Sequence, residues 1–303
     1  MSNQFCGGHI LLYHGIFSEI PPGLESRIHN VFPEDFKRQV IWLRQNFDIV
    51  TIDEFSKANT RKGLAVITFD DAYLTIFSEA LPWLIKEGIP ATVFLNSSLL
   101  EGEIFWRDKV RYLISNHLVE NFLNFCGGTS WVSKVRGERF YKDTKNPNLN
   151  SKIVNAALDQ FFLEHELATA VTAQLGQVIA RRGDLISDPL ITYGNHTHSH
   201  FVLSSLTEEE QRVEITGCQS WLEESGLDLS NIFAAPFGGN LDINVQTTQI
   251  LEEQGARGIA MSRKAINQSA KDKVSNKVNV LERYMAPPTL PQLQDLAALL
   301  EQG

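Results

Sequence analysis

Residues 64–71 read LAVITFDD, an apolar run with β-branched side chains that ends in two adjacent acids. Such a run is typical of a strand that is buried on both faces, as in a parallel sheet. Asp70 and Asp71 follow where this strand should end. Two adjacent carboxylates repel each other and resist burial unless a cation or a proton offsets their charge. The stretch therefore predicts either a site that holds a cation or the acidic first turn of a helix.

The segments on both sides of this run alternate between strand and helix patterns. Upstream, residues 8–13 (GHILLY) predict a strand, residues 33–47 an amphipathic helix and residues 49–52 a second short strand. Downstream, residues 73–88 predict a helix that Pro82 should kink or shorten in its first half, and residues 91–95 (ATVFL) predict the next strand. Two strands joined by a helix in this way run parallel with a right-handed crossover.

The same alternation returns in the second half of the chain. Strands are expected at residues 190–193, 232–235, 258–261 and 278–281, and helices at 207–225, 243–254 and 290–300. About seven strands that alternate with helices predict an α/β fold, a distorted parallel (β/α) barrel. Active sites of such barrels lie at the C-terminal ends of the strands.

Residues 101 to about 188 differ in character, because they contain few β-branched runs. Helical spacing is found at residues 106–118, 153–163 and 165–179. We therefore expect residues 1–303 to form a single barrel domain that carries a helical insertion at about 101–188.

The composition narrows the class of protein. Of the 303 residues, 43% are hydrophobic and 21% charged, which is typical of a globular protein. A net charge of −9 argues against a nucleic-acid partner, because no basic excess is available to neutralise phosphates. Three widely spaced cysteines suggest no disulfide framework. No membrane span and no signal peptide are evident, so a cytoplasmic location is expected. The sequence carries no signal for an oligomeric state.

Residues 195–200 read NHTHSH and hold three of the eight histidines of the chain. His196 and His200 are four positions apart, which allows both imidazoles to face one point. Two imidazoles and one carboxylate suit a divalent metal ion and leave positions open for water, and Asp71 is the natural carboxylate. The alternative is a chance cluster of histidines in a polar loop.

Three motifs occur in an order that is familiar from one family: TFDD at residues 68–71, H-T-x-x-H at 196–200 and APFG at 235–238. Together they resemble the polysaccharide deacetylase family (carbohydrate esterase family 4, the NodB-homology domain). The resemblance is good over residues 64–98 and 190–262 and poor in the insertion. It implies a metal-dependent amide hydrolase that removes an N-acetyl group from an amino sugar, an oligosaccharide or a polysaccharide.

The resemblance also implies roles for particular residues. Asp71, His196 and His200 would be the ligands of one divalent metal ion, with zinc expected and cobalt or nickel possible. Asp70 would be the general base that deprotonates the attacking water. A backbone N–H near Phe237 would stabilise the oxyanion of the tetrahedral intermediate.

Two departures from the family pattern concern the groups around the base and the acid. The third motif usually starts with an arginine that orients the base, and Ala234 stands there in this chain. Arg283, just after the last expected strand, is the candidate replacement, and an ordinary surface arginine is the alternative. No histidine follows residue 240, so a late LxH motif is missing. The early YHGI at residues 13–16 resembles permuted members that deacetylate exopolysaccharide glucosamine, which makes His14 the expected general acid and His9 the poorer candidate.

Aromatic side chains near the motifs and in the insertion could contact a sugar, although each could equally belong to the core. They are Tyr73, Trp106, Trp131, Phe201, Phe237 and Tyr284. The expected substrate is a small carbohydrate or a lipid- or nucleotide-linked amino sugar met inside the cell. The alternatives are a deformylase or another C–N hydrolase on the same scaffold, a catalytically silent carbohydrate-binding protein, and a scaffold subunit with a structural metal.

Overall fold

The computed structural model describes residues 5–268 and 278–302, and in these residues nine strands form one parallel sheet. Residues 1–4, which belong to the N-terminal segment judged not to be a signal peptide, lie outside the described part. The strands are β1 (His9–Tyr13), β2 (Asp48–Ile49), β3 (Leu64–Asp70), β4 (Ala91–Leu95), β5 (Ile191–Asn195), β6 (Leu229–Ala234), β7 (Gly258–Met261), β8 (Asn279–Glu282) and β9 (Tyr284–Met285). The sequence predicted all of these strands except β9.

One stretch of chain closes the sheet into a barrel. The strand order is β8-β7-β6-β5-β4-β3-β1-β9, and β2 pairs with β3 beside this path. β8 and β9 lie at opposite ends of the order, yet only Arg283 separates them in the chain. Residues 279–285 therefore join the two edges of the sheet, because β8 pairs with β7 and β9 pairs with β1. Closure removes the exposed edges of the sheet, and the predicted distorted (β/α) barrel is confirmed.

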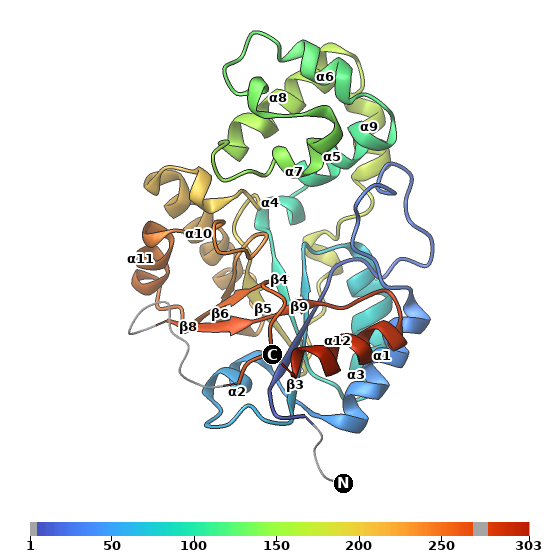
Figure 1. The fold of residues 1–303 in the computed structure, drawn as a ribbon, viewed down its shortest axis with the longest axis vertical. Helices are drawn as coiled ribbons and strands as arrows, with labels where there is room; N and C mark the ends of the chain where they lie inside the picture. Colours follow the sequence, from blue (N-terminus) through green and yellow to red (C-terminus); the bar gives the residue numbers. More distant parts are fainter. Residues whose placement is uncertain (1–4, 269–277, 303) are drawn as a thin grey trace.

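Helices surround the barrel (Figure 1). They are α1 (Pro33–Asn46), α2 (Ile52–Lys57), α3 (Leu81–Lys86), α10 (Glu208–Glu223), α11 (Val245–Glu253) and α12 (Leu290–Leu300). Each of these packs an apolar face inward, as α1 does with Phe36, Val40 and Leu43. Inside the barrel, a separate cluster of buried side chains includes Ile52 and Phe55 of α2, so this short helix covers the N-terminal end of the barrel.

The insertion forms a helical lobe over the other end of the barrel (Figure 1). Its helices are α5 (Trp106–Ser115), α6 (Val119–Phe125), α7 (Phe140–Asp143), α8 (Ser151–Glu164) and α9 (Ala168–Leu175), and the short α4 (Ser97–Leu100) precedes it after β4. Short 3₁₀ turns are found in the insertion at Val132–Lys134, Gly137–Arg139 and Arg182–Asp184, and another follows β5 at Leu203–Ser205. Aromatic side chains fill the lobe, with Phe122 in contact with Phe140 and Phe161. The lobe thus lies on the side of the barrel where the strands end.

Some element boundaries differ from the sequence-based expectation. The helix predicted at 106–118 ends earlier, at Ser115, because the chain turns at His117, where φ is +57°, before α6 begins. Pro82 goes with a shortened helix, because α3 begins only at Leu81 and has Pro82 in its first turn. A π turn at Ile76–Ala80 directly precedes it. Within the described ranges, no helix has the length and apolar content that a membrane crossing requires.

Candidate active site

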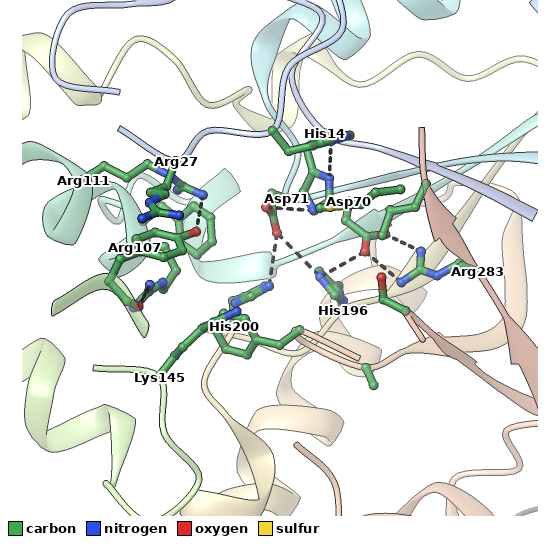
Figure 2. A pocket seen from close by; sticks show the side chains of 18 residues that line it. His14, Arg27, Asp70, Asp71, Arg107, Arg111, Lys145, His196, His200 and Arg283 are labelled. Atoms are coloured by element: carbon green, nitrogen blue, oxygen red, sulfur yellow. Dashed lines mark hydrogen bonds and ion pairs between the residues drawn. The ribbon is translucent and has the colours of Figure 1, made fainter. Parts of the chain in front are cut away.

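The motif residues meet at the C-terminal rim of the barrel (Figure 2). Asp70 is the last residue of β3, and Asp71 follows it. His14 directly follows β1, and His196 directly follows β5. Arg283 lies in the gap between β8 and β9. Because all strands are parallel, their ends lie at one rim, and side chains from distant parts of the chain converge there.

Asp71, His196 and His200 form a buried group whose ligand atoms lie within 4.8 Å of one another. Asp71 Oδ1 is 3.2 Å from His200 Nε2 and 3.6 Å from His196 Nε2. Ligands at about 2.0–2.2 Å from a tetrahedral zinc ion lie roughly 3.3 Å from one another. The three side chains are therefore spaced as the ligands of one metal ion.

Hydrogen bonds outside this group orient both histidines. His196 Nδ1 is 2.9 Å from the carbonyl oxygen of Ala234 and donates to it, which directs Nε2 toward Asp71. The Trp106 indole N–H donates to the carbonyl oxygen of His200 at 2.9 Å. The Phe237 ring packs edge-on against the His200 ring, with centroids 4.8 Å apart. The two imidazoles are thus held in position by the surrounding protein.

The protonation states also suit a cation. Burial raises the pKa of Asp71, but the nearby His200 and His196 outweigh it and hold that pKa far below its usual range. Burial lowers the pKa of His200 to about 3, so this imidazole is neutral at pH 7. Asp71 Oδ1 is buried and has no hydrogen-bond partner among the described residues. A buried carboxylate oxygen without a partner is costly, and a metal ion bound between these side chains would satisfy it.

The backbone is strained at the residues that carry this group. Asp71, Thr197, His200 and Phe237 have φ values of +72°, +70°, +58° and +63°. Non-glycine residues rarely adopt positive φ, and such strain persists only where the surrounding structure enforces it. Here it occurs at the turn after β3, in the histidine loop and in the third motif, and it places the site side chains.

Asp70 is held by Arg283 and is not part of the metal-ligand group. The guanidinium donates two hydrogen bonds to this carboxylate, Nη1 to Oδ1 at 2.8 Å and Nη2 to Oδ2 at 2.9 Å, and Arg283 is fully buried. Burial raises the pKa of Asp70, but Arg283 and then His196 outweigh it, and the net pKa lies below its usual value. Arg283 is thus a buried partner of Asp70, and the surface-arginine alternative is wrong.

His14 faces the same group and is paired with a histidine that the sequence did not indicate. His14 Nε2 is 3.7 Å from Asp71 Oδ2, and its Nδ1 is 3.2 Å from Nδ1 of His29. His29 Nε2 lies 2.7 Å from the carbonyl oxygen of Ala286 and donates to it. Burial, and then the proximity of His14, lower the pKa of His29 to about 4, so its Nδ1 accepts the hydrogen bond from His14. The His14 Nε2 lone pair is therefore directed at the site.

His9 lies away from this rim. Its Nδ1 is 2.8 Å from the Tyr284 hydroxyl, and its Nε2 is 2.8 Å from Glu301 Oε1. The hydrogen bonds of His9 are thus structural.

The acids, the histidines other than His9, and Arg283 line a cavity of about 130 Å³. The aromatic side chains that line it are Phe105, Tyr141 and Phe237, and only Phe237 was a candidate from the sequence. Tyr73, Tyr284 and Trp106 are buried and do not line the cavity, although Trp106 supports it through its hydrogen bond to His200. Four cationic residues complete the lining: Arg27, Arg107, Arg111 and Lys145. Three of them come from the insertion, where no motif could have indicated them.

Comparisons with known proteins agree with this geometry. A sequence profile of the family described as polysaccharide deacetylase matches residues 57–121 and 166–259, more than half of the chain. No curated protein matches the sequence significantly.

Several solved structures share the fold. IcaB from Ammonifex degensii is 18% identical, with a TM-score of 0.58 over 98% of each chain. The Streptococcus pyogenes deacetylase PplD in complex with acetate is 16% identical, with a TM-score of 0.57 over 97% of this chain and 99% of that one. The putative polysaccharide deacetylase BA0330 from Bacillus anthracis is 14% identical, with a TM-score of 0.56 over 96% of this chain and 69% of that one. The profile match identifies the chain as a member of the polysaccharide deacetylase family, a hydrolase of carbon–nitrogen bonds other than peptide bonds that removes N-acetyl groups from carbohydrates.

Proposed function

We propose that this deacetylase is metal-dependent, with Asp71, His196 and His200 as the ligands of one divalent ion and Asp70 as the general base. The supporting observation is that the two adjacent acids have different partners. Asp71 lies with the two histidines, whereas Asp70 is bound by Arg283 and remains outside the ligand group. A protein that only binds carbohydrate would need no such second carboxylate.

The donor set favours zinc, with cobalt or nickel as alternatives, because two imidazoles and one carboxylate leave open positions in the coordination shell. When bound, such an ion acts as a Lewis acid toward the amide carbonyl oxygen and lowers the pKa of water.

Asp70 accepts the proton of the attacking water. The two hydrogen bonds from Arg283 fix the plane of the carboxylate and keep it ionised, so the base is ready in the resting enzyme. Asp70 Oδ2 is 3.6 Å from His196 Nε2, which places this oxygen beside the ligand group.

His14 transfers the proton to the departing amine at its Nε2 atom. Burial lowers the pKa of His14, although Asp71 partly opposes this, so the imidazole is neutral at rest. It takes up the proton that Asp70 removes from the attacking water and passes it to the amine nitrogen as the carbon–nitrogen bond breaks. The pairing with His29 fixes the tautomer that exposes Nε2 to the cavity. The N–H of Phe237 is the proposed donor to the oxyanion, and among the described residues it has no hydrogen-bond acceptor.

The proposed substrate is an N-acetylated amino sugar, lipid- or nucleotide-linked, that the enzyme meets in the cytoplasm. Cell fractionation would test the location. The decisive test of the reaction is acetate release from a panel of N-acetyl amino sugars, with and without chelator and with added Zn²⁺, Co²⁺ or Ni²⁺. Chelation should abolish release and one of the ions should restore it. Faster release of formate from the N-formyl analogues would indicate a deformylase instead.

Three variants test the residue roles. Asp71→Ala should lose the metal. His14→Ala should keep it but lower kcat by about 10²–10⁴-fold, because an amine leaves poorly without a proton. His198→Ala is the matched control, since His198 lies between the two ligands in sequence but its Nδ1 bonds to Ser97. Elemental analysis that finds metal in Asp71→Ala, or none in His14→Ala, would contradict the assignment.

A further inference from the structure

One wall of the active-site cavity is cationic. Arg27, Arg107, Arg111 and Lys145 lie on one side of the pocket, and the acid–histidine group lies on the other (Figure 2). We call these four residues the cationic wall. The chain as a whole has a net charge of −9, so this concentration of positive charge is local.

Among the described residues, the cationic wall has one acidic ion-pair partner. Asp108 forms an ion pair with Arg111 and also accepts a hydrogen bond from the Tyr73 hydroxyl. Arg107 is only 1% exposed, and its hydrogen bonds go to neutral oxygens of Thr144 and Tyr141 at 3.0 and 2.7 Å.

The other three cations of the wall lack an ion-pair partner within the described residues; of these, Arg27 is exposed to solvent, and Asp242 acts on Lys145 at longer range. The Nε of Arg107 is buried and has no partner. In the described part of the chain, Arg27, Arg107 and Lys145 form no ion pair.

Such an arrangement is unfavourable without an anion. Burial, and next the charge of Arg107, lower the pKa of Lys145. Burial likewise lowers the pKa of Arg107 to about 10, even though the Tyr141 side chain opposes this change. Both shifts show that the charged forms of these side chains are destabilised in this wall. A bound anion would offset the repulsion between them.

The cationic wall is close to the proposed metal ligands. Lys145 Nζ lies 4.6 Å from the centroid of the Phe237 ring, and the same ring packs on His200 with centroids 4.8 Å apart. Arg107 also lies over Phe237, at 5.7 Å. One aromatic ring therefore contacts both regions, so a single sugar could place its acetamide at His200 and a neighbouring substituent at the wall.

We propose that Arg27, Arg107 and Lys145 form an anion subsite, and that the substrate is an amino sugar carrying a phosphate or a carboxylate close to its N-acetyl group. This inference rests on the proposed deacetylation. Guanidinium and ammonium groups are the usual partners of such oxyanions. Of the two sources, phosphate matches better, because it carries up to about two negative charges near pH 7 and a carboxylate carries one.

The test compares neutral and acidic substrates with the metal-loaded enzyme. The neutral probes are N-acetylglucosamine and tri-N-acetylchitotriose. The acidic probes are N-acetylglucosamine 1-phosphate, uridine diphosphate N-acetylglucosamine and N-acetylmuramic acid. The first two carry phosphate groups, and the third tests a carboxylate instead. We expect a higher kcat/KM for one or more acidic probes than for N-acetylglucosamine.

Variants of the subsite separate charge recognition from the reaction. Lys145→Gln and Arg27→Gln should each lower kcat/KM for the preferred acidic probe about tenfold, mainly through KM, because each removes one charge-assisted contact. Both should leave the values for neutral probes within about twofold. Lys142→Gln is the matched control, since Lys142 is exposed and outside the cavity lining. Arg107 is a poorer target, because its buried hydrogen bonds contribute to folding.

The outcomes distinguish this inference from the proposed function. Equal rates for neutral and acidic probes, or equal losses for both in Lys145→Gln, would overturn the anion subsite and leave the deacetylase intact. If no probe released acetate, the proposed reaction would be in doubt, and calorimetric binding of the acidic probes would decide the subsite. Weaker binding in Lys145→Gln than in Lys142→Gln would support it, and equal binding would overturn it.

Discussion

Asp70 and Asp71 are neighbours in the chain, yet they have different partners. Asp70 is still in β3 and points at Arg283, whereas Asp71 has left the strand with φ at +72° and faces the two histidines. The change of backbone conformation between them separates two carboxylates that would otherwise repel each other. One acid can therefore serve as a ligand and the other as a base, with the like charges balanced by different cations.

At the residue scale, the ion pair between Asp70 and Arg283 should matter for both folding and activity. Arg283→Met keeps most of the side-chain volume but leaves the Asp70 carboxylate buried without its cation. We expect the free energy of unfolding to fall by about 3–5 kcal/mol, because an uncompensated buried charge is strongly destabilising. Urea unfolding measures this change.

The control for Arg283→Met is Arg38→Met, since Arg38 is exposed and lies 3.9 Å from Asp35. That exposed pair should contribute at most about 1 kcal/mol. Arg283→Lys should recover part of the stability, although a lysine cannot donate the paired hydrogen bonds. A similar stability for Arg283→Met and Arg38→Met would show that Arg283 does not compensate Asp70.

At the element scale, α10 positions the loop that carries the histidines. The Glu214 backbone carbonyl accepts a hydrogen bond from the His198 N–H at 2.8 Å, and the Glu214 carboxylate accepts one from the Ser199 N–H at 2.7 Å. The Asn195 side-chain amide donates to the carbonyl oxygen of Ile215 at 2.9 Å. The loop therefore depends on a helix whose start is set by the capping box between Thr207 and Glu210.

Glu214→Ala should loosen this loop without removing a metal ligand. We expect the affinity for Zn²⁺ to fall about tenfold, as for other residues that hold metal ligands in place, with kcat largely retained at saturating metal. Isothermal titration of the metal-free protein measures the affinity. Glu209→Ala, at an exposed position of the same helix, is the control. An unchanged affinity in Glu214→Ala would mean that the loop is held by other contacts.

At the scale of the whole molecule, the two ends of the chain are tied together away from the active site. The Glu301 carboxylate, after α12, accepts hydrogen bonds from the Cys6 and Gly7 amides at 2.7 and 3.0 Å and lies 2.8 Å from His9 Nε2. The candidate site is at the opposite end of the barrel, lined by residues of the strand ends and of the helical lobe; Figure 1 shows the lobe at that end. The contacts that join the chain ends are thus separate from the candidate site.

The stability contributed by Glu301 should depend on pH. Burial raises its pKa, but the hydrogen bonds from Cys6, Gly7 and His9 outweigh this, so the pKa in the folded protein lies below the unfolded value of 4.5. Its stabilising effect is therefore complete above that value and is lost as the pH falls through the folded pKa. Glu301→Gln should lower the free energy of unfolding by about 1–2 kcal/mol at pH 7.

This difference between the wild type and Glu301→Gln should shrink as the pH falls below about 4.5. Denaturant unfolding from pH 7 to pH 3 measures it. A difference that stays constant over this range would mean that the ionised form of Glu301 is not the one that stabilises the fold.

The sequence by itself determined the barrel and most of the proposed metal site. Buried parallel strands have a local pattern, and Asp71, His196 and His200 directly follow such strands or lie a few residues beyond them. In a parallel barrel, that position is sufficient to bring them to one rim. The family motifs then supplied their roles.

Only the tertiary structure decided the remaining parts of the site. Arg283 reaches Asp70 because residues 279–285 close the barrel, and His29 is placed by contacts with His14 and Ala286. The cationic wall combines Arg27, from the loop between β1 and α1, with three residues of the helical lobe, which lies over the rim. These positions arise from packing between segments far apart in the chain, and no local pattern of residues encodes such packing.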